Sequence, residues 1–92
     1  MDVYSQIVTR IIKQQEGIIG PVAVEQAKEV ANLEVDWDKK EVSVKGNGAK
    51  VIDDLVAKYK TLFGQISVEV CKEAAGPLIG KLADNPLPKT LA

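Results

Sequence analysis

Histidine is absent from the chain of 92 residues, and cysteine occurs only once, as Cys71. A lone cysteine cannot form a disulfide within the chain, and without histidine no Cys–His nucleophile can be assembled. A zinc site built by this chain alone is set aside for the same reason. We therefore expect no catalytic residue, no cofactor and no bound metal, and we expect Cys71 to be a buried structural thiol.

Aromatic residues are scarce, at 4% of the chain, so the core must be built mainly from aliphatic residues and alanine. No apolar run approaches the roughly 20 residues that a membrane helix needs, and no basic stretch followed by an apolar run opens the chain. These absences predict a cytoplasmic protein without a membrane partner.

Twelve basic residues against thirteen acidic ones give a net charge of −1. This balance argues against nucleic acid as a partner, because nucleic-acid-binding domains usually carry a clustered basic excess.

Four segments place apolar residues at helical spacing, and glycine separates the members of each pair. The spacing predicts helices over residues 2–16, 21–31, 49–62 and 65–75, and either Asp2 or Ser5 can cap the first of them. Gly76-Pro77 either kinks the last helix or separates off a short fifth helix over 78–83. Residues 85–92 contain two prolines and predict a loose or docked tail.

Between the two helical pairs the apolar period changes from 3.6 residues to 2. Leu33 and Val35 alternate with acidic residues, and Val42 and Val44 alternate with polar ones. This pattern predicts a two-stranded antiparallel β-hairpin over 33–46 whose apolar face packs on the helices. Trp37 continues the first alternation, which favours a place in the core, whereas an exposed Trp37 would be a binding anchor for a partner.

The helical pairs form an internal repeat, because a shift of 44 residues aligns 7–31 with 51–75 without a gap. The identical pairs are Gly20/Gly64, Val24/Val68, Glu25/Glu69, Lys28/Lys72, Glu29/Glu73 and Ala31/Ala75. Two such hairpins bury their apolar sides against each other, which predicts a four-helix assembly with possible pseudo-two-fold symmetry. The predicted class is α+β, predominantly helical. One domain spans 1–84, with repeat one over 2–32 and repeat two over 49–83, and the tail spans 85–92.

The second copy of the repeat has the wider apolar surface. Val70 stands where the first copy has Gln26, and further apolar residues follow Gly76-Pro77. A helix that is apolar on more than one face is either central or half of an interface. The candidate interface residues are Val70, Leu78, Ile79, Leu82 and Trp37. For a chain this small, the pattern predicts a homodimer or another protein partner.

A glycine-rich turn links the second predicted strand to the third predicted helix. Free backbone N–H groups at a helix start favour anions, and two lysines flank this turn. The candidate anion-binding residues are Lys45, Gly46, Gly48 and Lys50. The turn lacks the third glycine of a dinucleotide loop and the Gly-Lys-Ser/Thr ending of a P-loop. The alternative is a tight turn and helix start, which need the same glycines.

The segment Ile18-Ile19-Gly20-Pro21-Val22-Ala23 lies between two amphipathic helices. It resembles the helix–Gly-Pro–helix segments of small bacterial proteins of uncharacterised function and of bacterial signalling proteins. The resemblance covers about six residues of the first repeat, and Gln65 replaces the proline in the second. It implies a regulatory or interaction role and transfers no functional residue.

The leading functional hypothesis is a non-catalytic protein-interaction or dimerisation module. It rests on the missing reactive residues and on the wide apolar surface of the second copy. The alternative is a small-molecule binder that holds an anion or nucleotide-type ligand at the glycine-rich turn. A nucleic-acid-associated protein comes third.

Overall fold

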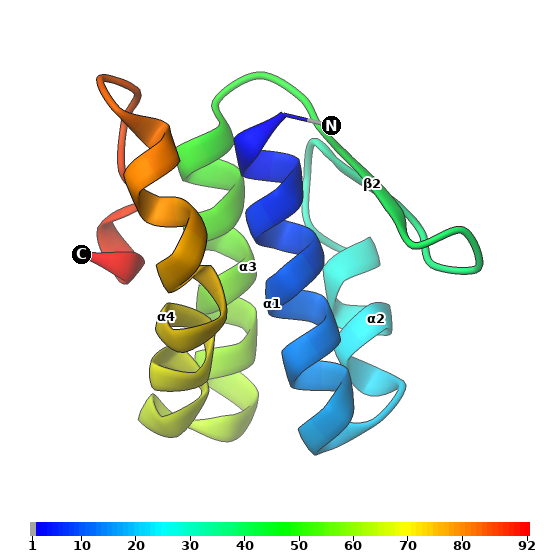
Figure 1. Ribbon diagram of the computed structural model, residues 1–92. Coiled ribbons are helices and arrows are strands. Elements are labelled where there is room, and N and C mark those ends of the chain that lie inside the picture. The colour runs from blue at the N-terminus through cyan, green and yellow to red at the C-terminus, as the bar shows by residue number, and fades with distance from the viewer. Residues whose placement is uncertain (1) are drawn as a thin grey trace.

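The computed structural model describes residues 2–92 and has four α-helices and one two-stranded antiparallel sheet in this range (Figure 1). The helices are α1 (Val3–Ile19), α2 (Val22–Lys28), α3 (Gly48–Phe63) and α4 (Gln65–Ile79). The strands are β1 (Leu33–Asp36) and β2 (Glu41–Val44), and the short 3₁₀ turns are η1 (Gly80–Leu82) and η2 (Lys89–Leu91). The predicted class, α+β and predominantly helical, is confirmed.

Helix α1 shows how the sequence sets the helix limits. The Asp2 carboxylate accepts a hydrogen bond from the Ser5 N–H at 2.8 Å and so caps the first turn. The helix continues past Gly17 and ends at Gly20, whose φ of 78° lies in the left-handed region. The predicted end at residue 16 is therefore three residues early, because one glycine inside a helix costs only about 1 kcal/mol.

Helices α2 and α4 also differ from their predicted lengths. Helix α2 ends at Lys28, and Asn32, with φ of 63°, turns the chain into β1. Helix α4 runs through Pro77 to Ile79, so the two segments around the proline are continuous. Pro77 has no N–H to give to the carbonyl four residues before it. The next carbonyl, that of Ala74, accepts a hydrogen bond from Arg10 Nε of α1 at 2.7 Å.

The predicted hairpin is present, and its apolar face packs on the helices. Leu33 pairs with Val44 and Val35 pairs with Val42, which places all four side chains on one face. Trp37 lies in the turn rather than in the strand, and it is buried, which confirms its expected place in the core. Its indole Nε1 donates a hydrogen bond to Glu16 Oε2 at 3.0 Å, so the hairpin is fastened to α1.

The two repeats adopt equivalent structures. Helices α1 and α3 run in the same direction, and both end at the lower edge of the molecule in Figure 1. Gly20 and Gly64 have φ of 78° and 81°, and each N–H donates to the carbonyl four residues earlier. Both turns therefore close the preceding helix in the same way.

Two buried hydrogen bonds join the repeats reciprocally. Gln15 Nε2 of the first repeat donates to the Ser67 carbonyl of the second at 3.1 Å. The Tyr59 hydroxyl of the second repeat donates to the Ala23 carbonyl of the first at 2.7 Å. In the 44-residue alignment, Tyr59 corresponds to Gln15 and Ser67 corresponds to Ala23. The same two positions are thus linked in both directions, as an approximate two-fold axis between the repeats requires.

The C-terminal tail is docked. The Tyr4 hydroxyl donates to the Pro86 carbonyl at 2.7 Å. The Asp53 carboxylate on α3 accepts hydrogen bonds from the Thr90 hydroxyl at 2.6 Å and from the Thr90 N–H at 2.9 Å. Leu91 is buried in the core, and η2 packs against α3 and α4. The tail thus belongs to the same packed unit as the helices.

Candidate functional site

Exposed apolar side chains gather at the end of the bundle that carries both glycine turns. Of the large apolar residues that are exposed among residues 2–92, only Leu87, in the tail, lies elsewhere. The others are Ile18 at 60% exposure, Leu62 at 51%, Phe63 at 37% and Ile66 at 72%. We call these four residues the glycine-turn end.

The local sequence explains why these side chains face solvent. Each glycine reverses the chain within one or two residues, so the last residues of α1 and α3 and the first of α4 lie beyond the packed core. Ile18 and Leu62 occupy corresponding positions in the two repeats and are exposed to a similar degree. For this pair the exposure follows from the repeated turn, whereas Ile19 and Val22, which correspond to Phe63 and Ile66, are half-buried.

The glycine-turn end is also free of charge in the sequence. Residues 17–22 and 61–68 contain no charged side chain, although 27% of the chain is charged. The charged residues directly next to these runs are Glu16, Lys60 and Glu69, of which Glu16 and Lys60 occupy corresponding positions and have opposite signs. An uncharged apolar surface bordered by charges has the composition of a protein interface core with its rim.

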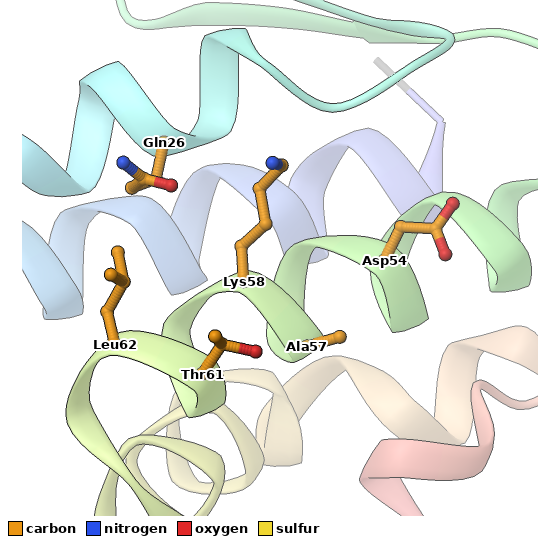
Figure 2. Close-up of a pocket in the computed structure, with 6 residues that line it drawn as sticks. All are labelled: Gln26, Asp54, Ala57, Lys58, Thr61 and Leu62. Carbon is orange, nitrogen blue, oxygen red and sulfur yellow. The ribbon is translucent and has the colours of Figure 1, made fainter.

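A shallow groove of about 310 Å³ between α2 and α3 opens onto the glycine-turn end. Figure 2 shows Gln26 on α2 and Lys58 with Leu62 on α3, on opposite sides of this groove. The Lys58 ammonium group lies 3.8 Å from a Glu29 carboxylate oxygen, so this cation has a partner. Leu62 lines the groove and also belongs to the glycine-turn end, so a partner bound there also reaches the groove.

Cys71 lies in the core beneath this surface and is fully buried. Its sulfur accepts a hydrogen bond from Gln15 Nε2 at 3.3 Å. Burial raises the pKa of the Cys71 thiol from 9.0 to about 11, and the hydrogen bond from Gln15 partly opposes the rise. Burial also raises the pKa of the Tyr59 phenol, and the nearby Cys71 adds to the rise. Cys71 is therefore a neutral structural thiol at ordinary pH, because the thiolate is the reactive form.

We expect the titration of the Cys71 thiol to lower the stability of the protein as the pH rises from 9 to 11. The folded pKa is higher than the unfolded one, so its contribution to stability is complete below pH 9 and is lost as the pH approaches 11. Urea unfolding at several pH values should show a steeper fall for the natural chain than for Cys71→Ala, which shares every other titrating group. Parallel curves for the two proteins would contradict the raised pKa.

The residues of the predicted anion-binding turn have structural roles in the folded chain. Lys45 pairs with Glu34 and Lys50 with Asp54, each at 2.8 Å. Gly46 has a positive φ of 72°, and a Cβ at Gly48 would collide with the ring of Tyr4. The two glycines are thus accounted for by the turn and by packing. Anion binding at this turn remains a prediction.

The predicted interface residues are mostly covered within the monomer. Leu78, Leu82 and Trp37 are buried in the core, and Val70 and Ile79 are half-buried. Helix α4 packs against α1 and α3 and also contacts η2 of the docked tail, and the hydrogen bond to Glu16 holds Trp37 against α1. The exposed apolar surface of the second repeat lies instead at its other end, at the glycine turn.

The exposure of Ile18, Leu62, Phe63 and Ile66 was not predicted from the sequence. Periodicity cannot distinguish a helix end that is covered from one that projects beyond its neighbours. The sequence feature that marks this exposed surface is the pair of uncharged runs around Gly20 and Gly64.

Comparison with protein-family models, curated proteins and solved structures finds no match to this chain. Within residues 2–92, no helix is both long enough and apolar enough to span a bilayer.

Proposed function

We propose that this protein is a non-catalytic interaction module that binds a protein partner through the glycine-turn end. The observation that supports the proposal is the clustering of Ile18, Leu62, Phe63 and Ile66 at one end of the bundle. Single exposed apolar residues are common on protein surfaces and need no explanation. Several of them at the same end of a small domain indicate a candidate interaction site.

The energetics favour a partner that covers this surface. Burying one large aliphatic or aromatic side chain stabilises a complex by about 1.5–3 kcal/mol relative to leaving it exposed. The glycine-turn end carries four such side chains, and no charge within residues 17–22 and 61–68 has to be desolvated when they are covered. The helices beneath are held together by the Gln15 and Tyr59 hydrogen bonds, so little ordering is needed on binding.

The other functional hypotheses have no comparable support. Both lysines of the glycine-rich turn are engaged in ion pairs, and the net charge of −1 gives no basic excess for nucleic acid. Both hypotheses, and the cytoplasmic location, remain predictions.

We expect a photo-reactive amino acid at position 66 to crosslink to a protein when it is introduced into the full chain in cells. Ile66 is 72% exposed at the centre of the uncharged region, so a partner that covers the glycine-turn end must lie next to it. The control is the same amino acid at position 87, where Leu87 is exposed in the tail, outside the proposed surface. The measurement is the size and peptide composition of the adducts.

A defined adduct from position 66 that is missing or much weaker from position 87 supports the proposal. No protein adduct from position 66, or equal adducts from both positions, would overturn it. Substituting Leu62→Ser in the crosslinking chain should reduce the adduct, because Leu62 belongs to the same surface.

A further inference from the structure

We infer that residues 84–92 form a strap that opens from the helices as a unit, hinged at a strained turn over residues 82–85. The strap follows the upper end of α4 in Figure 1, opposite the glycine-turn end, so the inference does not depend on the function proposed for that surface. It is supported by the backbone conformation of Ala83, by the small number of contacts that hold the strap closed, and by the apolar surface that the strap covers.

The turn that leads into the strap has alanine at a position that favours glycine. The Asn85 N–H donates a hydrogen bond to the Leu82 carbonyl at 2.8 Å, so residues 82–85 form a β-turn. Ala83, the second residue of this turn, has φ of 50° and ψ of −113°. These angles are those of a type II′ turn, in which the second residue is usually glycine because a Cβ is crowded at positive φ. The closed strap therefore holds an alanine in an unfavourable backbone conformation.

The strain at Ala83 persists because both sides of the turn are fixed. Leu82 before it is buried in the core, and the strap after it is docked on α3 through Thr90. Ala83 itself is exposed, so burial of its methyl group does not offset the strain. A residue keeps such a conformation only where the surrounding structure imposes it. Opening the strap frees one side of the turn and releases the strain.

Few contacts oppose this opening, and most of them meet at one carboxylate. Asp53 on α3 accepts hydrogen bonds from the Lys89 N–H at 3.2 Å, from the Thr90 N–H at 2.9 Å and from the Thr90 hydroxyl at 2.6 Å. The Tyr4 hydroxyl adds an exposed hydrogen bond to the Pro86 carbonyl. A segment with few buried contacts and exposed hydrogen bonds opens at a lower free energy than the core. Because three bonds share one acceptor, they break together.

Opening uncovers an apolar surface on α3 and α4. Pro88 and Leu91 are buried side chains of the strap, and η2 contacts both helices. When the strap leaves, the apolar groups beneath these two residues become accessible together with the Asp53 carboxylate. The strap is therefore an internal cover for this surface, and the turn at Ala83 sets how often the surface is exposed.

Hydrogen exchange of the natural full-length chain, followed amide by amide by NMR, tests the inference. In the closed strap the Thr90 N–H donates to Asp53 and the Leu91 N–H donates to the Pro88 carbonyl. We expect both amides to exchange through one common opening, about a hundredfold or more faster than the amide of Val56, which is buried on α3. Equal protection of the strap and of Val56 would mean that the strap opens only with the whole protein, and would overturn the inference.

Two glycine substitutions in the same turn test the role of the strain. Ala83→Gly relieves the closed state, so exchange of Thr90 and Leu91 should slow about threefold to tenfold, after allowance for the freedom that glycine gains in the open state. Asp84→Gly is the matched control, because Asp84 is also exposed and does not have a positive φ. Glycine there only adds freedom to the open state and should speed the exchange about threefold. Shifts in the same direction would overturn the strained hinge.

Asp53→Ala tests whether the shared carboxylate holds the strap. The substitution removes the acceptor of three hydrogen bonds, so the Leu91 amide should exchange at least about tenfold faster. The amide of Ile11, buried on α1, should be unchanged, and circular dichroism confirms that the variant is folded. Unchanged exchange at Leu91, or an equal increase at Leu91 and Ile11, would overturn a strap that opens separately from the core.

Discussion

Tyr59→Ala is expected to lower the free energy of unfolding by about 3–5 kcal/mol, the range observed when large aromatic core residues are truncated. Tyr59 is fully buried on α3, where its ring contributes to the core between the two repeats. Its hydroxyl also donates to the Ala23 carbonyl at 2.7 Å. The substitution therefore leaves a cavity and removes a buried hydrogen bond between the repeats. Urea unfolding followed by the fluorescence of Trp37 or by circular dichroism measures the loss.

Tyr59→Phe separates the hydroxyl from the ring. It keeps most of the packing and removes the hydrogen bond, so a cost of about 1–2 kcal/mol is expected. A similar cost for Gln15→Met, which removes the reciprocal bond to the Ser67 carbonyl, would support the equivalence of the two repeats. If Tyr59→Phe costs nothing, the hydroxyl does not hold the repeats together.

Gly48→Ala is expected to destabilise the protein by about 1–3 kcal/mol, the usual cost of overfilling a packed site. A Cβ at this position would overlap the base of the Tyr4 ring, at Cγ and both Cδ atoms. The ring cannot easily move away, because the Tyr4 hydroxyl is bonded to the Pro86 carbonyl of the docked tail. Thermal unfolding or urea unfolding measures the change.

Gly17→Ala is the matched control. Gly17 lies inside α1, and a Cβ there would meet nothing within 4 Å. Alanine should therefore stabilise the helix by about 0.5–1 kcal/mol, so the two glycine substitutions should have opposite signs. In a Tyr4→Ala background, Gly48→Ala should lose most of its cost, because the clash is gone. An unchanged cost in that background would contradict the steric explanation.

Much of the fold could be predicted from the sequence because local patterns and the global structure agree. The change of apolar period at Leu33 predicts the hairpin, and the 44-residue shift predicts equivalent halves, as the Gly20 and Gly64 turns show. The helix limits were less accurate. Gly17 was too weak a signal to end α1, and Pro77 did not end α4, which continues to Ile79.

The candidate site could not be predicted because it depends on which apolar residues the tertiary structure leaves uncovered. Leu78 and Leu82 looked available, yet both are buried in the core, where α4 contacts α1, α3 and the docked η2. That docking uses hydrogen bonds from Thr90 to Asp53, a contact across 37 residues that no local pattern predicts. Ile66 shows the opposite case, since it was not named as a candidate interface residue and its place beside the turn leaves it exposed.

The reciprocal bonds between Gln15 and Ser67 and between Tyr59 and Ala23 have a consequence for how the molecule is assembled. Each half supplies the donor that the other half's backbone needs, so an isolated half would expose to water the polar and apolar groups that the other half covers. The geometry is that of a symmetric dimer whose two subunits have been joined into one polypeptide, with the β-hairpin as the tether. A tether of this length raises the effective concentration of one half near the other to about the millimolar range. Cutting the chain in the hairpin turn would turn folding into a bimolecular association of two complementary fragments.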